Sequence, residues 1–320
     1  MHCFDAHHHL WRYSAAEYGW INERMSPLRR DFLPAHLRAE MEAANIGQCL
    51  AVQARQTLEE TEWLLDLAEE NHEIAGVIGW APIASAEFPA LLDSLAARPH
   101  LKGLRHILQD EADPRYALSD GFTQGLRCFQ SSGMVYEILL YAHQLPVALA
   151  LVDQHPQQSF VLDHLGKPSI ACAQSKPEEI SHWRKHLDAL AKRSHVSCKL
   201  SGLATEANWD CWSLDLLRPY LDAALESFGP DRLMAGSDWP VCTLATSYQR
   251  WWKTLRDWCS RLSASEQKKI LCENAMRIYN LDPHNLELYR LDRKLDHNLD
   301  RKLAPDSPLK SNNPASETLP

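Results

Sequence analysis

The chain has 320 residues, 45% of them hydrophobic and 23% charged, a composition that suits a globular protein and argues against general disorder. Its formal net charge of -9 disfavours a nucleic-acid partner, because no cluster of Lys and Arg offsets the repulsion from phosphates. The sequence shows neither a signal-like start nor an apolar run of about 18 residues, which predicts no secretion and no contact with a membrane. Nine single cysteines without a CxxC pair favour reduced thiols in the cytoplasm, and a small molecule is the expected partner.

Short runs of β-branched and apolar residues recur along the chain, each followed by a stretch with helical features. The predicted strands, in chain order, are residues 2–7, 48–54, 74–80, 102–107, 134–141, 159–163, 195–200 and 232–236. Eight alternations over about 280 residues predict an α/β protein with a (β/α)8 TIM barrel. An open doubly wound sheet is the alternative, and no GxGxxG loop supports it.

The stretches between the strands carry helix signals. Thr57 with Glu60 forms a capping box ahead of an apolar stripe and predicts a helix over residues 57–71. Residues 177–192 begin with a proline and two glutamates and continue with apolar residues at helical spacing. After residue 284 the chain repeats a charged LDRKL segment and becomes rich in Ser, Pro and Asn. We therefore expect residues 1–284 to form the barrel and residues 285–320 to be a disordered tail.

Two histidines and an arginine lie at the C-terminal ends of two predicted strands. His7 and His9 lie two residues apart, so they should face the same side, where they could bind a divalent metal or an anionic substrate. A chance run of histidines is the competing interpretation. Arg105 closes the fourth strand, where its guanidinium could hold a carboxylate or a carbonyl oxygen. Of Arg105 and its neighbour His106, only one can point inward.

Two further candidates follow the sixth and eighth predicted strands. Asp238 is placed to project over the barrel mouth as a general base, although a turn or helix-capping aspartate is an equal alternative beside Pro240. His164 is either a site residue or a capping or core histidine, and the preceding Asp163 is expected to face the other way. Weaker candidates for binding sugar hydroxyls, for which ordinary barrel packing is the competing account, are Gln53, Arg55, Trp80, Tyr141 and Lys199.

The strongest indication of function is the convergence of these residues. His7, His9, Arg105, His164 and Asp238 come from four predicted strands, and all lie near the C-terminal ends of those strands. A (β/α)8 barrel assembles its active site at that end, whereas chance would scatter such residues between both ends. The sequence therefore predicts an active site formed by these five side chains.

Six phrases make residues 2–281 resemble the amidohydrolase superfamily, and within it the lactonases related to L-fuconolactone and L-rhamnonolactone hydrolases. They are DAHHHLW (5–11), GLRHILQDE (103–111), FVLDHLGKP (160–168), CKLSGL (198–203), RLMAGSDWPVC (232–242) and ENAMRIY (273–279). The resemblance implies that His7, His9 and Asp238 bind a metal and that His164 is the histidine of strand six. Binuclear members also use a bridging lysine and a histidine after strand five, where this chain has Tyr141 and His143. We therefore expect at most one divalent ion, Zn²⁺ or Mn²⁺, and the resemblance also implies that some lactonases of this branch work without a tightly held metal.

The function implied by the resemblance is hydrolysis of a sugar-acid lactone to the aldonic acid. Asp238 is then expected to deprotonate water, while the metal, or Arg105 and His164 in its absence, polarises the carbonyl group. The nearest alternative is a decarboxylase of the same superfamily, which could use the same set of residues. A third interpretation is a barrel that binds a sugar acid without turnover.

Overall fold

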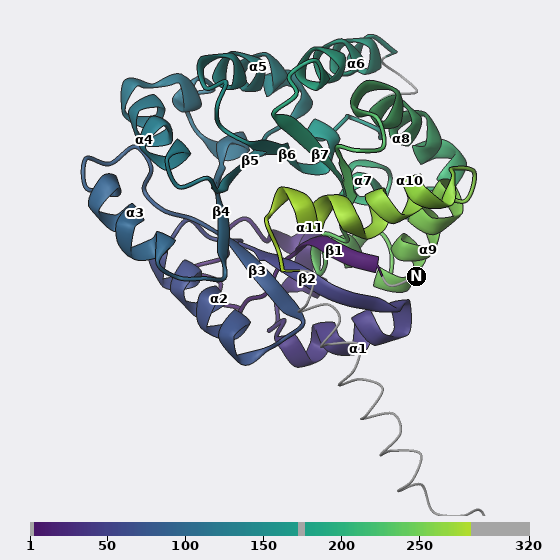
Figure 1. The fold of residues 1–320 in the computed structure, drawn as a ribbon. Coiled ribbons are helices and arrows are strands. Elements are labelled where there is room, and N and C mark those ends of the chain that lie inside the picture. Colours follow the sequence, from purple (N-terminus) through teal and green to yellow (C-terminus); the bar gives the residue numbers. More distant parts are fainter. Residues whose placement is uncertain (1–2, 172–176, 283–320) are drawn as a thin grey trace, which may run out of the picture.

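The computed structural model describes residues 3–171 and 177–282. Within these ranges, eight parallel strands pair in the order β1 to β8, and a bridge from His8 to Trp239 brings β8 back to β1. The helices surround the strands, so the predicted (β/α)8 barrel is confirmed (Figure 1). The predicted tail, residues 285–320, lies outside the described residues.

Each strand overlaps its predicted range. The strands are β1 (Cys3–His8), β2 (Ile46–Val52), β3 (Ile74–Gly79), β4 (Leu101–Ile107), β5 (Val135–Leu139), β6 (Phe160–Leu162), β7 (Val196–Leu200) and β8 (Leu233–Ala235). The α-helices are α1 (Pro34–Ala44), α2 (Leu58–Glu70), α3 (Phe88–Ala96), α4 (Asp120–Gln130), α5 (Leu145–Gln154), α6 (Pro177–Ala191), α7 (Leu203–Glu206), α8 (Leu214–Phe228), α9 (Tyr248–Cys259), α10 (Ala264–Lys268) and α11 (Asn274–Ile278). None of these described helices has the length and apolarity needed to cross a membrane.

Only half of the capping box predicted for α2 forms. The Thr57 hydroxyl accepts a hydrogen bond from the Glu60 backbone N–H at 3.2 Å. The Glu60 carboxylate instead accepts hydrogen bonds from the backbone N–H groups of Ala54 and Arg55, at 2.9 and 2.7 Å. Its side chain thus fixes the loop that follows β2 rather than the start of its own helix.

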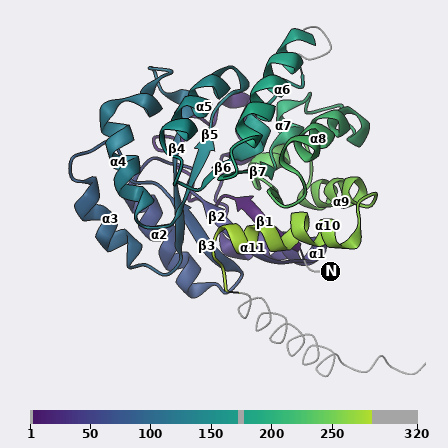
Figure 2. The same ribbon diagram turned by 45° about the horizontal axis from the view of Figure 1, so that its top comes forward.

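Alternation along the strands divides the apolar side chains into two cores. One core lies between the barrel and its outer helices and includes Tyr136 and Cys198. The other fills the barrel interior toward the end where the strands begin, and it includes Phe4, Val161 and Met234. This interior core continues into α11, which lies beside β1 in both views and closes the end of the barrel where the strands begin (Figures 1 and 2).

Candidate active site

The end of β1 is irregular where it enters the site. The register between β1 and β2 shifts between Asp5 and His8. Asp5 faces the outer helices, where it accepts a hydrogen bond from the Tyr248 hydroxyl of α9 at 2.9 Å. Regular alternation would place His7 on the same side as Asp5, but the irregularity turns the His7 ring into the barrel, as a bulge beside an active site commonly does. The Nε2 atoms of His7 and His9 then lie 3.2 Å apart.

Asp238 comes to these histidines from the end of β8. Its backbone N–H donates to the His7 carbonyl at 2.8 Å, and the His9 N–H donates to the Trp239 carbonyl at 2.6 Å. Asp238 adopts a left-handed backbone with φ of 59°, a conformation that is uncommon outside glycine. Its Oδ1 consequently lies 3.4 Å from His9 Nε2 and 3.8 Å from His7 Nε2.

His164 reaches the same point from the short turn after β6. Its φ of 50° is also left-handed, and its Nε2 lies 3.9 Å from Asp238 Oδ1. On the other side of the ring, Nδ1 lies 2.9 Å from the Ser201 hydroxyl. Gly202 is required beside it, because a Cβ there would lie 2.6 Å from His164 Nδ1 and its φ is 69°. The glycine of the CKLSGL phrase therefore makes room for this histidine.

Burial and mutual contact set the charges of these groups. Burial lowers the pKa of His164 to about 4, against the attraction of the Asp238 carboxylate, and lowers the pKa of His7 well below its ordinary value. Burial acts to raise the pKa of Asp238, but His164 and His9 hold it below its ordinary value. At neutral pH the Asp238 carboxylate thus faces the neutral imidazoles of His7 and His164, which suits both proton abstraction and metal binding.

The donor atoms fit a single divalent metal ion. A tetrahedral zinc ion with bonds of roughly 2.1 Å has ligand atoms roughly 3.4 Å apart. Asp238 Oδ1 lies 3.4–3.9 Å from the Nε2 atoms of His7, His9 and His164. The second nitrogen of each ring is held from outside: His9 Nδ1 lies 2.8 Å from the Val52 carbonyl, His164 Nδ1 is at Ser201, and His7 Nδ1 lies 3.4 Å from Asp163. The Val52 carbonyl and the Asp163 carboxylate only accept hydrogen bonds, so they favour the tautomers of His9 and His7 that carry the proton on Nδ1 and leave Nε2 free to bind a metal.

A layer of buried charges lies beneath this cluster. Lys199 Nζ on β7 contacts Glu137 Oε1 on β5 at 2.6 Å and Asp163 Oδ1 at 3.2 Å, and all three side chains are fully buried. Arg105 Nη1 donates to Asp163 Oδ2 at 3.0 Å, and Nη2 donates to the Gln53 carbonyl. Burial acts to raise the pKa of Asp163, but Lys199, His7 and Arg105 hold it well below its ordinary value. Burial also raises the pKa of Glu137 to about 7.

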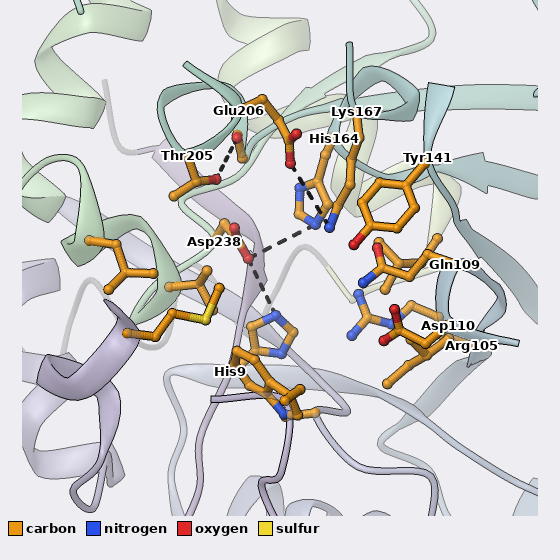
Figure 3. A pocket seen from close by; sticks show the side chains of 18 of the residues that line it. His9, Arg105, Gln109, Asp110, Tyr141, His164, Lys167, Thr205, Glu206 and Asp238 are labelled. Atoms are coloured by element: carbon orange, nitrogen blue, oxygen red, sulfur yellow. Dashed lines mark hydrogen bonds and ion pairs between the residues drawn. The ribbon is translucent and has the colours of Figure 1, made fainter. Parts of the chain in front are cut away.

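Above the cluster lies a cavity of about 300 Å³. His9, His164 and Asp238 point toward one another at its floor, with Tyr141 and Lys167 to one side (Figure 3). Its polar lining residues include Arg105, Gln109, Asp110, Tyr141, Lys167, Thr205 and Glu206, and its apolar ones include Trp20, Met25, Trp209, Val241 and Leu244. A cavity lined by both kinds of side chain suits a small ligand that carries polar groups and an apolar part.

The structure brings together the five convergent residues predicted from the sequence, and Tyr141 joins them on the cavity wall. The other four predicted contacts do not line this cavity. Lys199 lies in the buried layer below, and Gln53 donates to the Arg105 carbonyl at 3.2 Å. Arg55 pairs with Glu17. Trp80 Nε1 donates to His106 Nδ1 at 3.2 Å, so His106 belongs to the packing around the barrel.

Two buried acids were not predicted from the sequence. The expectation that Asp163 faces away is wrong, because Asp163 points into the barrel and the left-handed backbone that follows also turns His164 inward. Glu137 was not predicted at all, although a signal existed. Glu137 and Lys199 are lone charges inside apolar predicted strands, and buried charges in proteins are paired.

Lys167 and Glu206 on the cavity wall were also missed. Lys167 lies in the FVLDHLGKP phrase with φ of 46°, and its Nζ is 4.0 Å from Glu206 Oε1 and 5.4 Å from the centre of the Tyr141 ring. Lys167 lies in the turn after β6 and Glu206 ends α7, and the sequence does not specify how these two segments meet over the barrel.

A barrel with three histidines and an aspartate at its strand ends is the arrangement of a metal-dependent hydrolase, and the chain belongs to the amidohydrolase family, whose model matches residues 4–281. The chain is 43% identical to an L-fucono-1,5-lactonase of Burkholderia multivorans, over 87% of this chain and 95% of that protein. It is 33% identical to an L-fucono-1,5-lactonase of Burkholderia ambifaria, with the same coverage. The crystal structure of a Burkholderia multivorans amidohydrolase with bound zinc, 41% identical, superimposes with a TM-score of 0.83 over 88% of this chain and 100% of that one.

Proposed function

We propose that this amidohydrolase opens L-fucono-1,5-lactone, or a sugar-acid lactone of closely similar shape, to the aldonic acid. The observation that carries the proposal is the Asp238 carboxylate, held 3.4–3.9 Å from three imidazole nitrogens at the floor of the cavity. Lactone hydrolysis is the activity named for both curated relatives, which align with 87% of this chain. Three decarboxylases with similar structures are 12–14% identical to this chain and support the fold alone.

The chemistry needs an activated water, a polarised carbonyl group and a proton for the leaving ring oxygen. Asp238 accepts a proton from water as the hydroxide oxygen bonds to the lactone carbon, and it returns that proton to the ring oxygen when the C–O bond breaks. The Arg105 guanidinium borders the cavity where negative charge develops on the carbonyl oxygen. One water and one lactone give one hydroxy acid, so the proton returns to the product.

We further propose that His7, His9, His164 and Asp238 hold one divalent ion, with zinc favoured over manganese by three imidazoles and one carboxylate. A zinc-bound structure of a 41% identical amidohydrolase supports this assignment. When bound, such an ion supplies Lewis-acid polarisation of the carbonyl oxygen and lowers the pKa of a bound water.

The cavity walls support a 6-deoxy sugar. Tyr141, Lys167 and Glu206 can hydrogen-bond ring hydroxyls. Met25 and Trp209 offer an apolar surface to the methyl group that replaces a CH₂OH group in fuconate. Placing a hydroxyl against this surface is expected to reduce kcat/KM about tenfold or more, because a buried hydroxyl there finds no partner.

The experiment is a pH-indicator assay of freshly prepared lactones, with L-fuconolactone compared against L-galactonolactone, which differs only by the hydroxyl on C6. Each lactone is tested before and after chelation and after return of zinc or manganese. Acid release with preference for the deoxy lactone supports the proposal, and loss on chelation supports the metal. Release of CO₂ from an aromatic acid would establish a decarboxylase instead, and tight sugar-acid binding without turnover would establish a binding protein.

A further inference from the structure

A second group of possible metal ligands lies below the active-site cluster. His7, Glu137 and Asp163 each offer one ligand atom, and these three atoms lie within 4.8 Å of one another. All three side chains are fully buried. In composition and spacing this group could hold a divalent ion, and it shares His7 with the active-site cluster above.

An ammonium group already stands among these ligands. Lys199 Nζ lies 2.6 Å from Glu137 Oε1, 3.1 Å from His7 Nδ1 and 3.2 Å from Asp163 Oδ1. The ammonium group donates a hydrogen bond to Glu137 Oε1, forms an ion pair with the Asp163 carboxylate and lies beside the His7 ring. Its positive charge faces two carboxylates in a region that solvent does not reach.

We propose that the Lys199 ammonium is a built-in cation that fills a second metal site, so that the chain binds a single divalent ion in its barrel. This role of Lys199 rests on the metal site proposed for His7, His9, His164 and Asp238, and it does not depend on the identity of the substrate. With Lys199 in this place, His7 is a ligand of the upper ion alone. A neutral imidazole has one nitrogen lone pair, so a ring that binds an ion through Nε2 cannot bind a second ion through Nδ1. Lys199 is therefore a positioning residue, which acts on the upper site through His7.

The charge balance of the layer predicts the effect of removing Lys199. Arg105 and Lys199 together offset Glu137 and Asp163, and Lys199→Met leaves one carboxylate without a counter-charge in a buried region. Among the described residues, Glu137 Oε2 is buried without a hydrogen-bond partner, so this carboxylate has an oxygen available to a metal. Lys199→Met is thus expected to recruit a divalent cation in place of the ammonium.

The test measures bound zinc per chain after equilibrium dialysis, by mass spectrometry, for the native protein and two single variants. We expect one ion in the native protein and in Lys199→Arg, which keeps a cation, and two ions in Lys199→Met. Thermal unfolding provides a second readout: zinc should raise the melting temperature of Lys199→Met, relative to chelated protein, more than it raises that of the native chain.

The double variant Lys199→Met with Glu137→Gln is the matched control, because it removes one ligand of the second site. It should return to one ion. A second ion that persists in the double variant lies elsewhere and contradicts the proposal, as does a folded Lys199→Met protein that binds no additional zinc. Two barrel ions in the native chain, lost one at a time on Glu137→Gln and Asp238→Asn, would overturn the proposal even where Lys199→Met does not fold.

Discussion

The two ends of the barrel are built differently. Where the strands begin, apolar side chains such as Met234 and Met276 pack between the barrel and α11. Where the strands end, the backbone is left-handed at His164, Asp238 and Gly202. Positive φ values also occur where the strands begin, at Asn45, Gly133 and Gly229, but there they belong to turns that lead into strands. At the end that carries the site, the same uncommon conformation directs the His164 and Asp238 side chains toward each other.

The largest effect on activity is expected for Asp238→Asn, which keeps the shape of the cavity floor and removes the base. We expect lactone turnover to fall about 10³-fold or more, since general base catalysis contributes about 10²–10⁴-fold and the charge opposite the imidazoles is also lost. Steady-state kinetics at saturating lactone measures the effect, with circular dichroism as the folding control. Turnover equal to that of the native protein would show that Asp238 is not the base.

The opposite end is tested by Met276→Ala in α11. Met276 is buried against the barrel interior, so the substitution should lower the free energy of unfolding by about 3 kcal/mol through lost burial and a cavity. At 25 °C kcat should stay within about twofold, because the site lies at the other end of the strands. Denaturant unfolding and kinetics on the same sample separate the two effects, and a large fall in kcat without loss of stability would contradict the division of the barrel.

Alanine substitutions at two glycines separate the effect of backbone strain from the effect of a steric clash with His164. Gly202 and Gly133 have nearly equal φ values of 69° and 71°, but a Cβ on Gly202 meets His164, whereas one on Gly133 meets nothing within 4 Å. Both alanine variants should lose about 1–2 kcal/mol of stability from the left-handed backbone. Only Gly202→Ala should also lose about tenfold in kcat/KM, because His164 must move. Equal activity in the two variants would show that the position of His164 is unimportant.

The smallest expected effect is the position of the acidic limb of the pH profile. His164 has a pKa lowered to about 4, and Asp238 has a pKa below its ordinary value, so both stay in the active ionisation state down to about pH 5. kcat/KM should therefore fall near pH 4 rather than near 6.5. Because the lowered histidine pKa values make the fold less stable as pH falls from about 6.5 toward 4, fluorescence must confirm folding at each pH. A limb near 6.5 in folded protein would contradict a buried neutral His164.

The sequence by itself determined the eight strands, their order and the end at which the chemistry lies. Strand residues repeat every two positions and buried strands are continuously apolar, so these features are local. The sequence also identified a set of neighbouring side chains, because all of them lie at or just after the carboxyl ends of parallel strands, which meet at one end of the barrel. These residues are His7, His9, Arg105, His164 and Asp238.

Only the tertiary structure decided where the side chains at the strand ends point. The register shift near His7 and the left-handed backbones at His164 and Asp238 break the alternation on which the expectation for Asp163 depended. It also decided that Lys199 is a buried partner of Glu137, 62 residues away, rather than a contact to substrate. The physical reason is that a buried charge takes its partner from whichever strand the closed barrel brings opposite it, and that pairing is not a local property of the chain.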